Sequence, residues 1–372
     1  MTVANRVLEP TSAADAATML AEAAAAGTPV VPVGTGSRLN VSRIQGPAVA
    51  FSSRRLTSGF AHYAGDLVAT LPAGMRLADA NIALGAERQW LPIDPLTGIQ
   101  TTIGGLVASN DSGPRRHGFG SPRDLVIGME VALTTGVVAH SGGRVVKNVA
   151  GYDLGRLFCG SLGSLGVITS VTFKLAPLPS ASRTVVARFA TPAAAVAAAL
   201  RLWKSPLTPS CLEVTGPEPR LLVRFETTAS SGHRMAASST QMLDDGVDVR
   251  TVTEADEAAI WSAHHEAFAI APVILKIVVL PNAVATMLTA AIALYPTCPI
   301  SARPALGVID IAVQDMNAVA PLTRAARECG GHVGVTRGDL RMAPDAGVTR
   351  VMNAVKQQFD PAGILPRPWE QA

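Results

Sequence analysis

The fold is decided by a ten-residue block of mostly small residues, Thr101-Thr102-Ile103-Gly104-Gly105-Leu106-Val107-Ala108-Ser109-Asn110. Small side chains let the main chain lie directly against a flat or extended ligand. The block belongs to the glycine-rich part of the chain, since 15 of the 33 glycines lie between Gly98 and Gly166. Because these glycines are dense but not periodic, they indicate either a backbone wrapped around a ligand or a β region rich in turns.

Two further glycine-rich segments flank this block. Upstream, an apolar run at residues 29–33 predicts a strand that leads directly into Gly34-Thr35-Gly36-Ser37-Arg38. Phosphate oxygens could be bound there by main-chain N–H groups, two hydroxyls and a guanidinium. The loop is not a G-x-G-x-x-G dinucleotide-binding fingerprint, because Leu39 stands in the place of the third glycine. Taken alone, the loop is also compatible with an ordinary turn. Downstream, residues 160–166 hold three glycines and run into Val167-Ile168-Thr169, which predicts the start of a strand.

Composition limits the class of protein. The chain has 372 residues, 48% hydrophobic and 16% charged, which predicts two or three globular domains. A net charge of +3 without a Lys/Arg block argues against nucleic acid as a partner. The four cysteines form no C-x-x-C pair, so we expect neither a disulfide framework nor an iron–sulfur cluster in this chain. The N-terminus has no apolar leader and no run is long enough for a transmembrane segment, which favours a cytoplasmic protein.

The prolines at 177 and 179 mark the predicted end of the first domain. Beyond them we expect two rounds of strands alternating with helices, with strands at 184–189, 212–215 and 221–226 and then at 273–280, 308–313 and 332–336. The order suggests strand–helix–strand–strand–helix–strand, which is typical of a split βαβ unit with an antiparallel sheet. A final helix is predicted over residues 345–359. We therefore expect domains at 1–178 and 179–340, followed by a C-terminal helix and tail at 341–372.

The three glycine-rich segments, in this order and spacing, resemble the FAD-binding domain of the vanillyl-alcohol oxidase and p-cresol methylhydroxylase family. That family has a glycine-rich pyrophosphate loop, a Thr-x-Gly-Gly-x-x-Ala-x-Asn block and a Gly-Tyr-Asp-Leu segment followed by Gly-Ser-x-Gly-x-Leu-Gly-Val-Ile-Thr. The tail Lys356-Gln357-Gln358-Phe359-Asp360-Pro361-Ala362-Gly363-Ile364-Leu365 is similar to the family's closing motif. The resemblance implies an α+β fold: a p-cresol methylhydroxylase-type (PCMH-type) FAD-binding domain of two α/β subdomains, then a smaller cap domain of antiparallel sheet and helices.

The resemblance also implies a set of residues that hold FAD. They are Gly34, Thr35, Gly36, Ser37, Arg38, Pro95, Thr101, Thr102, Gly104, Gly105, Ala108, Asn110, Gly113, Gly163, Gly166, Val167 and Ile168. The first five would lie at the pyrophosphate, the middle group along the flavin and its phosphates, and the last at the adenosine end. Covalently flavinylated relatives carry a histidine in the first loop, whereas residues 34–40 contain none, so the resemblance implies non-covalent FAD.

Within the family, the chain is most similar to the FAD-binding E subunits of bacterial glycolate oxidases. The similar features are Gly113-Pro114-Arg115-Arg116, Lys147-Asn148-Val149-Ala150-Gly151-Tyr152-Asp153 and the short second domain. This implies an FAD-dependent oxidoreductase acting on a CH–OH group, which converts glycolate or a similar 2-hydroxy acid such as D-lactate to the 2-oxo acid. It also implies two partners, a second flavoprotein subunit and an iron–sulfur subunit, through which a cytoplasmic chain could associate with a membrane.

Departures from the family keep other functions open. The His-x-Gly-Asp-Gly-x-x-x-His metal and substrate motif of related D-2-hydroxyacid dehydrogenases is missing, and only His332 stands in a similar place. In the third glycine-rich segment, Leu162 stands between Ser161 and Gly163 where the family usually has a glutamate. Arg115, Arg116 and Arg337 are candidates to hold a substrate carboxylate, but no catalytic base and no metal ligands are identified. The alternatives are a non-catalytic or electron-relay FAD subunit, or a stand-alone FAD-linked sugar or alditol oxidase.

Overall fold

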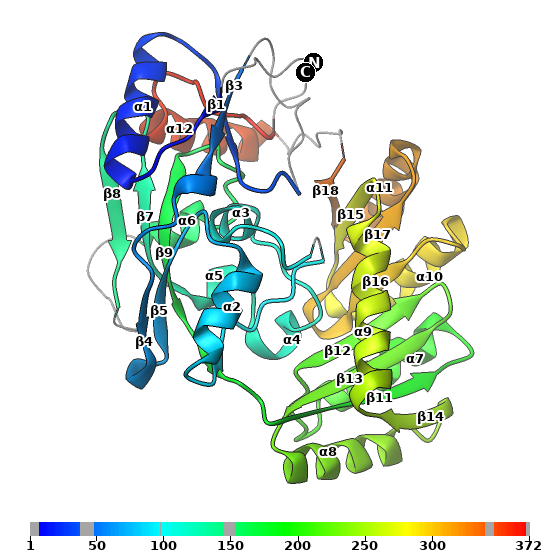
Figure 1. Cartoon of the computed structure of the whole chain (residues 1–372). Helices are drawn as coiled ribbons and strands as arrows, with labels where there is room; N and C mark the ends of the chain where they lie inside the picture. The colour runs from blue at the N-terminus through cyan, green and yellow to red at the C-terminus, as the bar shows by residue number, and fades with distance from the viewer. Residues whose placement is uncertain (1–6, 38–47, 97, 145–152, 339–345, 370–372) are drawn as a thin grey trace. The chain divides into compact units, whose positions relative to one another are not determined.

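The computed structural model describes residues 7–37, 48–96, 98–144, 153–338 and 346–369 (Figure 1). The chain divides into two compact units. Unit 1 comprises Met1–Ser112, Ser121–Leu178 and Arg341–Ala372, and unit 2 comprises Gly113–Gly120 and Pro179–Leu340.

Unit 1 begins with a small parallel sheet of three strands in the order β1-β3-β2. These strands are β1 (Val7–Leu8), β2 (Val30–Val33) and β3 (Val49–Ser52). Helix α1 (Ala13–Ala25) connects the first two and starts where the Ser12 hydroxyl accepts a hydrogen bond from the Asp15 N–H. The helix, the sheet and the C-terminal tail share one apolar cluster that contains Leu20, Phe51 and Ile364.

The second sheet of unit 1 has five antiparallel strands in the order β4-β5-β9-β7-β8. They are β4 (Ala61–Tyr63), β5 (Val68–Pro72), β7 (Val126–Ala132), β8 (Val138–Gly142) and β9 (Val167–Lys174). A pair of two-residue strands, β6 (Gln89–Trp90) and β10 (Ala176–Pro177), is separate from this sheet. Besides α1, the helices of unit 1 are α2 (Leu77–Gly85), α3 (Ile103–Ser109), α5 (Pro122–Leu125), α6 (Leu154–Phe158) and α12 (Ala346–Phe359), together with the 3-10 turns η2 (Ser53–Arg55) and η3 (Ala64–Asp66).

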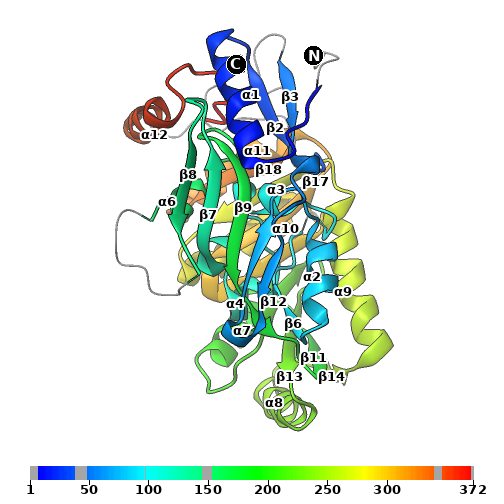
Figure 2. The same cartoon turned by 60° about the vertical axis from the view of Figure 1, so that its left-hand side comes forward.

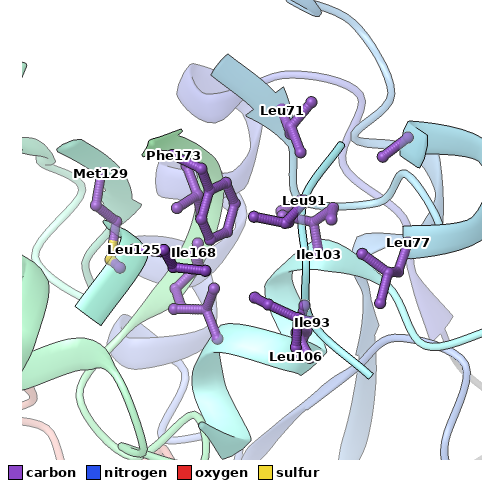
Figure 3. Close-up of a cluster of buried hydrophobic side chains, with 14 of the residues drawn as sticks. Leu71, Leu77, Leu91, Ile93, Ile103, Leu106, Leu125, Met129, Ile168 and Phe173 are labelled. Atoms are coloured by element: carbon purple, nitrogen blue, oxygen red, sulfur yellow. The ribbon is translucent and has the colours of Figure 1, made fainter. Parts of the chain in front are cut away.

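The main core of unit 1 lies between this second sheet and helices α2 and α3. Figure 3 shows Phe173 and Ile168 of β9 together with Leu91, Ile103 and Leu106. These side chains are at most 5% exposed. Residues 101–110 therefore contribute the large apolar side chains of Ile103, Leu106 and Val107 to this core, and their two glycines lie outside the apolar cluster.

Unit 2 is built on one eight-stranded antiparallel sheet with the order β14-β11-β13-β12-β16-β17-β15-β18, whose strands are labelled in Figure 1. Figure 2 gives the same structure turned by 60°. Its strands are β11 (Ala181–Arg188), β12 (Cys211–Gly216), β13 (Arg220–Thr227), β14 (Val247–Val252), β15 (Val273–Val278), β16 (Ile300–Arg303), β17 (Val308–Val313) and β18 (His332–Arg337). The order consists of two split βαβ halves that meet where β12 pairs with β16, with Val214 opposite Ala302. The double split βαβ pattern predicted from the sequence is present.

Four helices of unit 2 pack beside one another and against the sheet, and a fifth stands apart from them. The four are α7 (Pro192–Trp203), α8 (Ala229–Met242), α10 (Val284–Leu294) and α11 (Val319–Glu328). The fifth, α9 (Glu254–Ala269), contacts alternate residues of β11 that point away from α8. Short helix α4 (Arg116–Phe119) and the 3-10 turns η4 (Pro281–Ala283), η5 (Pro304–Leu306) and η6 (Met316–Ala318) complete this unit.

Strands β14 and β16 were not expected from the sequence. Strand β14 lies at the sheet edge and is largely exposed, but Val247 and Val249 alternate with Asp248 and Arg250, a signal that could have indicated it. Strand β16 is wholly buried, yet two of its four residues are Ser301 and Arg303. Burial of polar residues leaves no hydrophobic signal in the sequence.

The units divide the chain differently from the expected ranges at two places. Residues 113–120 fall in unit 2, where the N–H of Gly118 donates to the carbonyl oxygen of Ser210. The C-terminal segment belongs to unit 1, where the Phe359 ring packs edge-on against Phe158 at 5.4 Å. Both assignments depend on contacts between residues far apart in the chain, which composition shifts do not reveal.

Candidate cofactor site

Unit 1 contains a pocket of about 1010 Å³, including the part open to solvent. Three glycine-rich segments and the C-terminal tail form its walls. The lining residues are Val31, Pro32, Val33, Gly34, Thr35, Gly36, Ser37, Ser53, Thr101, Thr102, Gly104, Gly105, Ala108, Ser109, Leu162, Gly163, Gly166, Val167, Ile168, Pro366 and Pro368. Most of these side chains are small, so the main chain forms much of the pocket surface.

The first wall is the turn that follows β2. A Cβ at Gly34 would overlap the Thr102 hydroxyl, so only glycine allows this turn to approach the second segment so closely. The carbonyl oxygen of Gly34 accepts a 3.1 Å hydrogen bond from Nε of Arg54. That contact places the Arg54 guanidinium beside the turn that carries Thr35 and Ser37, although Arg54 itself does not line the pocket.

The second wall is the start of helix α3. Its N-cap is Thr102, whose hydroxyl accepts a 3.2 Å hydrogen bond from the N–H of Gly105. The same hydroxyl lies 3.0 Å from where a Cβ of Gly105 would be, so any larger side chain there would press on the cap. A main-chain hydrogen bond also anchors the segment, since the N–H of Gly104 donates to the carbonyl oxygen of Ala73 over 2.9 Å.

The third wall is the turn before β9. Gly163 has a φ of +73°, and an added Cβ would lie 3.0 Å from the Pro32 ring, so this position needs glycine for both its conformation and its packing. Leu162 beside it also has a positive φ of 53°, and its N–H donates to the carbonyl oxygen of Ala108 over 2.8 Å. The third wall is thus fixed to the other two.

Most of the residues predicted from the sequence come together here. Of the seventeen residues, three do not line the pocket and one lies outside the described residues. Pro95 is buried elsewhere in unit 1, and its carbonyl oxygen accepts from the N–H of Gly98. Asn110 ends helix α3 in a left-handed conformation, and its Oδ1 accepts from the N–H of Arg123. Gly113 belongs to unit 2, and Arg38 lies outside the described residues.

The structure adds lining residues that the sequence did not indicate. They are Val31, Pro32, Val33, Ser53, Ser109, Leu162, Pro366 and Pro368. The strand residues could have been inferred from their position just before the first loop. The two prolines follow residues 356–365, the tail segment that is similar to the family's closing motif.

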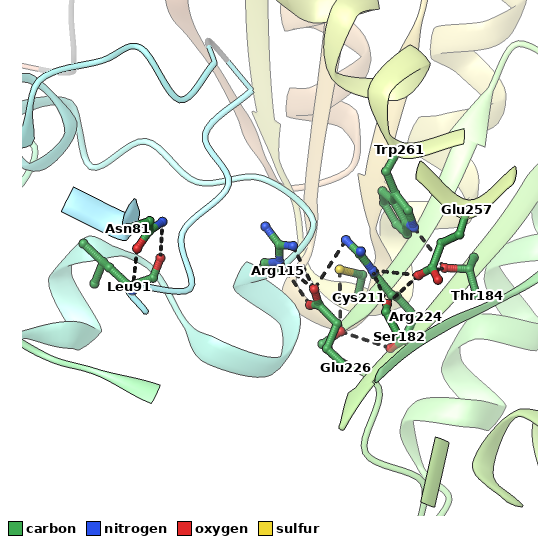
Figure 4. A network of polar contacts seen from close by, with 11 residues as sticks. Asn81, Leu91, Arg115, Ser182, Thr184, Cys211, Arg224, Glu226, Glu257 and Trp261 are labelled. Carbon is green, nitrogen blue, oxygen red and sulfur yellow. Dashed lines mark hydrogen bonds and ion pairs between the residues drawn. The ribbon is translucent and has the colours of Figure 1, made fainter. Parts of the chain in front are cut away.

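Unit 2 contains a different kind of cluster, which we call the polar network (Figure 4). Arg115 forms a two-pronged pair with the buried carboxylate of Glu226, at 2.7 and 3.0 Å. Arg224 bonds to Glu257 over 2.9 Å, and its guanidinium lies 5.4 Å from the ring centre of Trp261. Burial opposes ionisation of Glu226, but the hydrogen bond and charge of Arg115 outweigh it, so the pKa lies below its usual value.

A second part of the polar network surrounds Arg303, which is fully buried. Its guanidinium pairs with Asp310 and also donates to the carbonyl oxygen of Gly113. Ser301 donates to the buried carboxylate of Glu213. Burial, with the charges of His265 and Arg303, lowers the pKa of His264 to about 3, so this histidine is neutral near pH 7.

Three histidines of unit 2 lie outside the pocket. His264 and His265 lie on α9, and the ring of His264 meets the Trp261 ring edge-on at 5.9 Å. His332 begins the edge strand β18 and is exposed. Among the described residues, no group of three or more His, Cys, Asp or Glu side chains is arranged to hold a metal ion. No helix within the described ranges is long and apolar enough to cross a membrane.

Comparison with known families identifies the domain around the pocket. Residues 4–142 match the family described as the FAD binding domain. The matched residues include the first two walls of the pocket. FAD is therefore the cofactor implied by the fold, as the sequence predicts.

Several curated proteins are similar to part of the chain. The glycolate oxidase subunit GlcD of Bacillus subtilis is 35% identical over 50% of this chain and 39% of its own length. The glycolate oxidase subunit GlcE of Escherichia coli is 40% identical over 42% of this chain and 44% of its own length. A probable mitochondrial D-lactate dehydrogenase of Danio rerio is 26% identical over 64% of this chain and 52% of its own length. The chain thus aligns with about half or less of the length of these relatives.

The comparison with solved structures supports the fold over nearly the whole chain. An alkyldihydroxyacetonephosphate synthase structure matches 96% of this chain and 76% of its own, with a TM-score of 0.73 and 17% identity. The expected α+β fold is confirmed, with a PCMH-type FAD-binding domain of two α/β subdomains and a second domain of antiparallel sheet and helices.

The pocket suits FAD on structural grounds. FAD has a charged pyrophosphate between two flat ring systems, and a cradle of glycine main chain can approach both. At Gly36 the positive φ of 79° favours glycine. No atom lies within 4 Å of where its Cβ would be, so the space beside this residue is open, and a side chain would occupy it. Hydroxyls and Arg54 gather at the same wall, where a phosphate would find donors.

Proposed function

We propose that this chain is the FAD-binding subunit of a complex that oxidises glycolate, or a similar small 2-hydroxy acid such as D-lactate, to the 2-oxo acid. The observation that carries the proposal is the glycine-walled pocket inside the FAD-binding domain. The names of the relatives, two glycolate oxidase subunits and a D-lactate dehydrogenase, support the substrate class. Its class is an FAD-dependent oxidoreductase acting on a CH–OH group.

We assign roles within the pocket to the residues that line it. The N–H groups of residues 34–36 and the hydroxyls of Thr35 and Ser37 would donate to the pyrophosphate, with Arg54 adding charge. Residues 101–108 would lie along the flavin, and residues 163–168 would lie towards the adenosine end. Bound FAD supplies the capacity to accept electrons, and the protein supplies binding and orientation.

We expect FAD to be held without a covalent bond, because residues 34–40 contain no histidine. The purified chain should be yellow, and denaturant followed by filtration should release the flavin from the polypeptide. Yellow colour that stays with the denatured chain would contradict this part of the proposal. A folded, colourless protein that gains no flavin spectrum when FAD is added would contradict cofactor binding altogether.

A second candidate is a subunit that binds FAD for structure or electron relay, while a partner oxidises the substrate. Two arginines considered for the substrate carboxylate are engaged within unit 2. Arg115 pairs with Glu226, and Nη1 of Arg337 donates to the carbonyl oxygens of residues 268, 269 and 271. A guanidinium held in this way must break existing contacts before it can clamp a substrate, which favours the relay role.

The proposed partners are a second flavoprotein subunit and an iron–sulfur subunit, and the proposed location is the cytoplasm, with membrane association through those partners. The relatives named as separate glycolate oxidase subunits support a multi-subunit assembly. Co-purification from native cells, followed by identification of the bound chains, tests this. Recovery of the chain alone under gentle conditions would count against the complex.

A dye-reduction assay separates the two candidates. FAD-loaded chain alone and the reconstituted complex are each given glycolate or D-lactate with an artificial electron acceptor. We expect turnover in the complex and little in the isolated chain. Rapid turnover by the isolated chain would show that its own site is complete and that the relay role is wrong.

A further inference from the structure

The C-terminal tail contributes Pro366 and Pro368 to the pocket, although more than 190 residues separate it from the nearest other wall in sequence. A wall built from a chain end needs something to hold it in place. In unit 1 the holding contacts converge on two buried charged residues, Lys356 and Asp360, which are 2% and 1% exposed.

Asp360 fixes the tail itself. Its carboxylate accepts hydrogen bonds from the N–H of Ile364 over 3.2 Å and from the N–H of Leu365 over 2.9 Å. These two bonds close the turn that follows helix α12 and set the direction of the chain into Pro366. The carbonyl oxygen of Ile364 then accepts a 2.8 Å hydrogen bond from the N–H of Val30, the first residue of β2.

Lys356 connects that turn to the third wall of the pocket. Its Nζ donates to the carboxylate of Asp360 over 2.7 Å and to the carbonyl oxygen of Ser164 over 2.9 Å. Ser164 is itself 1% exposed and lies between two pocket residues, Gly163 and Gly166. A single buried ammonium group therefore bridges the glycine turn and the tail.

This arrangement is more than a buried ion pair. A buried ammonium or carboxylate is unfavourable unless every hydrogen-bonding position has a partner. Here the partners of the pair are main-chain groups of two pocket walls, so the pair is satisfied only when both walls occupy their positions. The contact with Val30 links the same turn to the strand that leads into the first wall.

We propose that Lys356 and Asp360 are positioning residues of the FAD site, which hold the tail and the glycine turn at the separation that the cofactor needs. Neither residue lines the pocket. They act through Ser164, Ile364 and Leu365. A purely structural pair would change the stability of unit 1 without changing how the folded protein binds FAD.

The variant test compares Lys356→Met with Leu84→Ala. Leu84 is also fully buried in unit 1, on helix α2, and does not line the pocket; its core cluster meets α12 at Val355 and Phe359 but does not include Ile364 or Leu365. Both substitutions should lower the melting temperature of the FAD-free protein. The Kd for FAD, titrated by flavin fluorescence well below that temperature, should rise roughly tenfold in Lys356→Met alone, equal to about 1.4 kcal/mol.

Equal FAD affinity in folded Lys356→Met and Leu84→Ala would overturn the proposal. Asp360→Asn should give a smaller loss, because an amide oxygen can still accept from Ile364 or Leu365 while the charge for Lys356 is gone.

A measurement on the unchanged chain keeps the proposal testable if the variants do not fold. Amide hydrogen exchange is followed with and without FAD. FAD should slow exchange at residues 364 and 365 together with residues 163–166, and by more than it slows exchange along helix α2. Tail amides that respond no more than those of α2 would overturn the proposal.

Discussion

The pocket of unit 1 and the polar network of unit 2 place polar groups in opposite ways. The pocket is walled by glycine and small residues, and its donors face an open space. In the polar network the buried guanidinium groups and carboxylates are paired with one another, as Arg303 with Asp310 and Arg115 with Glu226. Glycine leaves room for a ligand beside the main chain, whereas paired charges stabilise the packing of a sheet. The difference predicts that substitutions in the pocket change mainly FAD binding and that substitutions in the polar network change mainly stability.

The largest effect is expected at Arg303. Arg303→Met removes the guanidinium that pairs with the buried Asp310 and lies 4.0 Å from the buried Glu213, and it leaves Asp310 with the more distant ammonium of Lys276 at 3.9 Å. Removing one partner of a buried pair costs about 3–5 kcal/mol. Urea unfolding followed by tryptophan fluorescence should report this loss. A change below ~1 kcal/mol would mean that the network is not tightly coupled.

The next largest effect is expected on FAD binding, from Gly105→Asp with Ala194→Asp as its matched control. Both residues lie three positions after a threonine N-cap whose hydroxyl accepts their N–H, so the helix end favours a carboxylate equally in both. Only Gly105 lines the pocket. We expect FAD affinity to fall about 100-fold in Gly105→Asp, equal to about 2.7 kcal/mol, and to change little in the control. Equal affinity in the two variants would show that the glycine block is only a helix start.

A smaller, pH-dependent effect is expected from Glu226→Gln. Because the pKa of Glu226 is lowered in the folded state, its ionised form stabilises the fold above the unfolded pKa near 4.5, and this contribution is lost as the pH falls through the folded pKa. At pH 7 the wild type should be more stable by about 1.5–3 kcal/mol. The difference should shrink as the solution is acidified below pH 4.5. A difference that does not depend on pH would indicate lost packing and not lost charge.

The smallest effect is expected from Arg201→Met. Arg201 pairs with Asp245 at 2.6 Å, but both side chains are 43% exposed. Exposed pairs contribute about 0–1 kcal/mol because water and salt screen them. The variant should therefore unfold within ~1 kcal/mol of wild type, and added salt should reduce even that difference. A loss as large as that of Arg303→Met would remove the distinction between buried and exposed pairs.

The sequence by itself determined the cofactor chemistry, the three glycine-rich walls and the double split βαβ pattern. The main chain approaches the Thr102 side chain at Gly34 and the Pro32 ring at Gly163 so closely that only glycine fits, so this requirement can be read locally in the sequence. Regular apolar spacing likewise fixed most helices and strands without knowledge of their neighbours.

Only the tertiary structure decided which distant residues meet. It brought Pro366 and Pro368 to the pocket, turned Asn110 to a helix end and assigned Gly113 to unit 2. It also buried Arg303 beside Asp310, which no local pattern indicates. A hydrogen bond or ion pair between remote segments depends on how the whole chain packs, and the identity of either residue alone does not specify its partner.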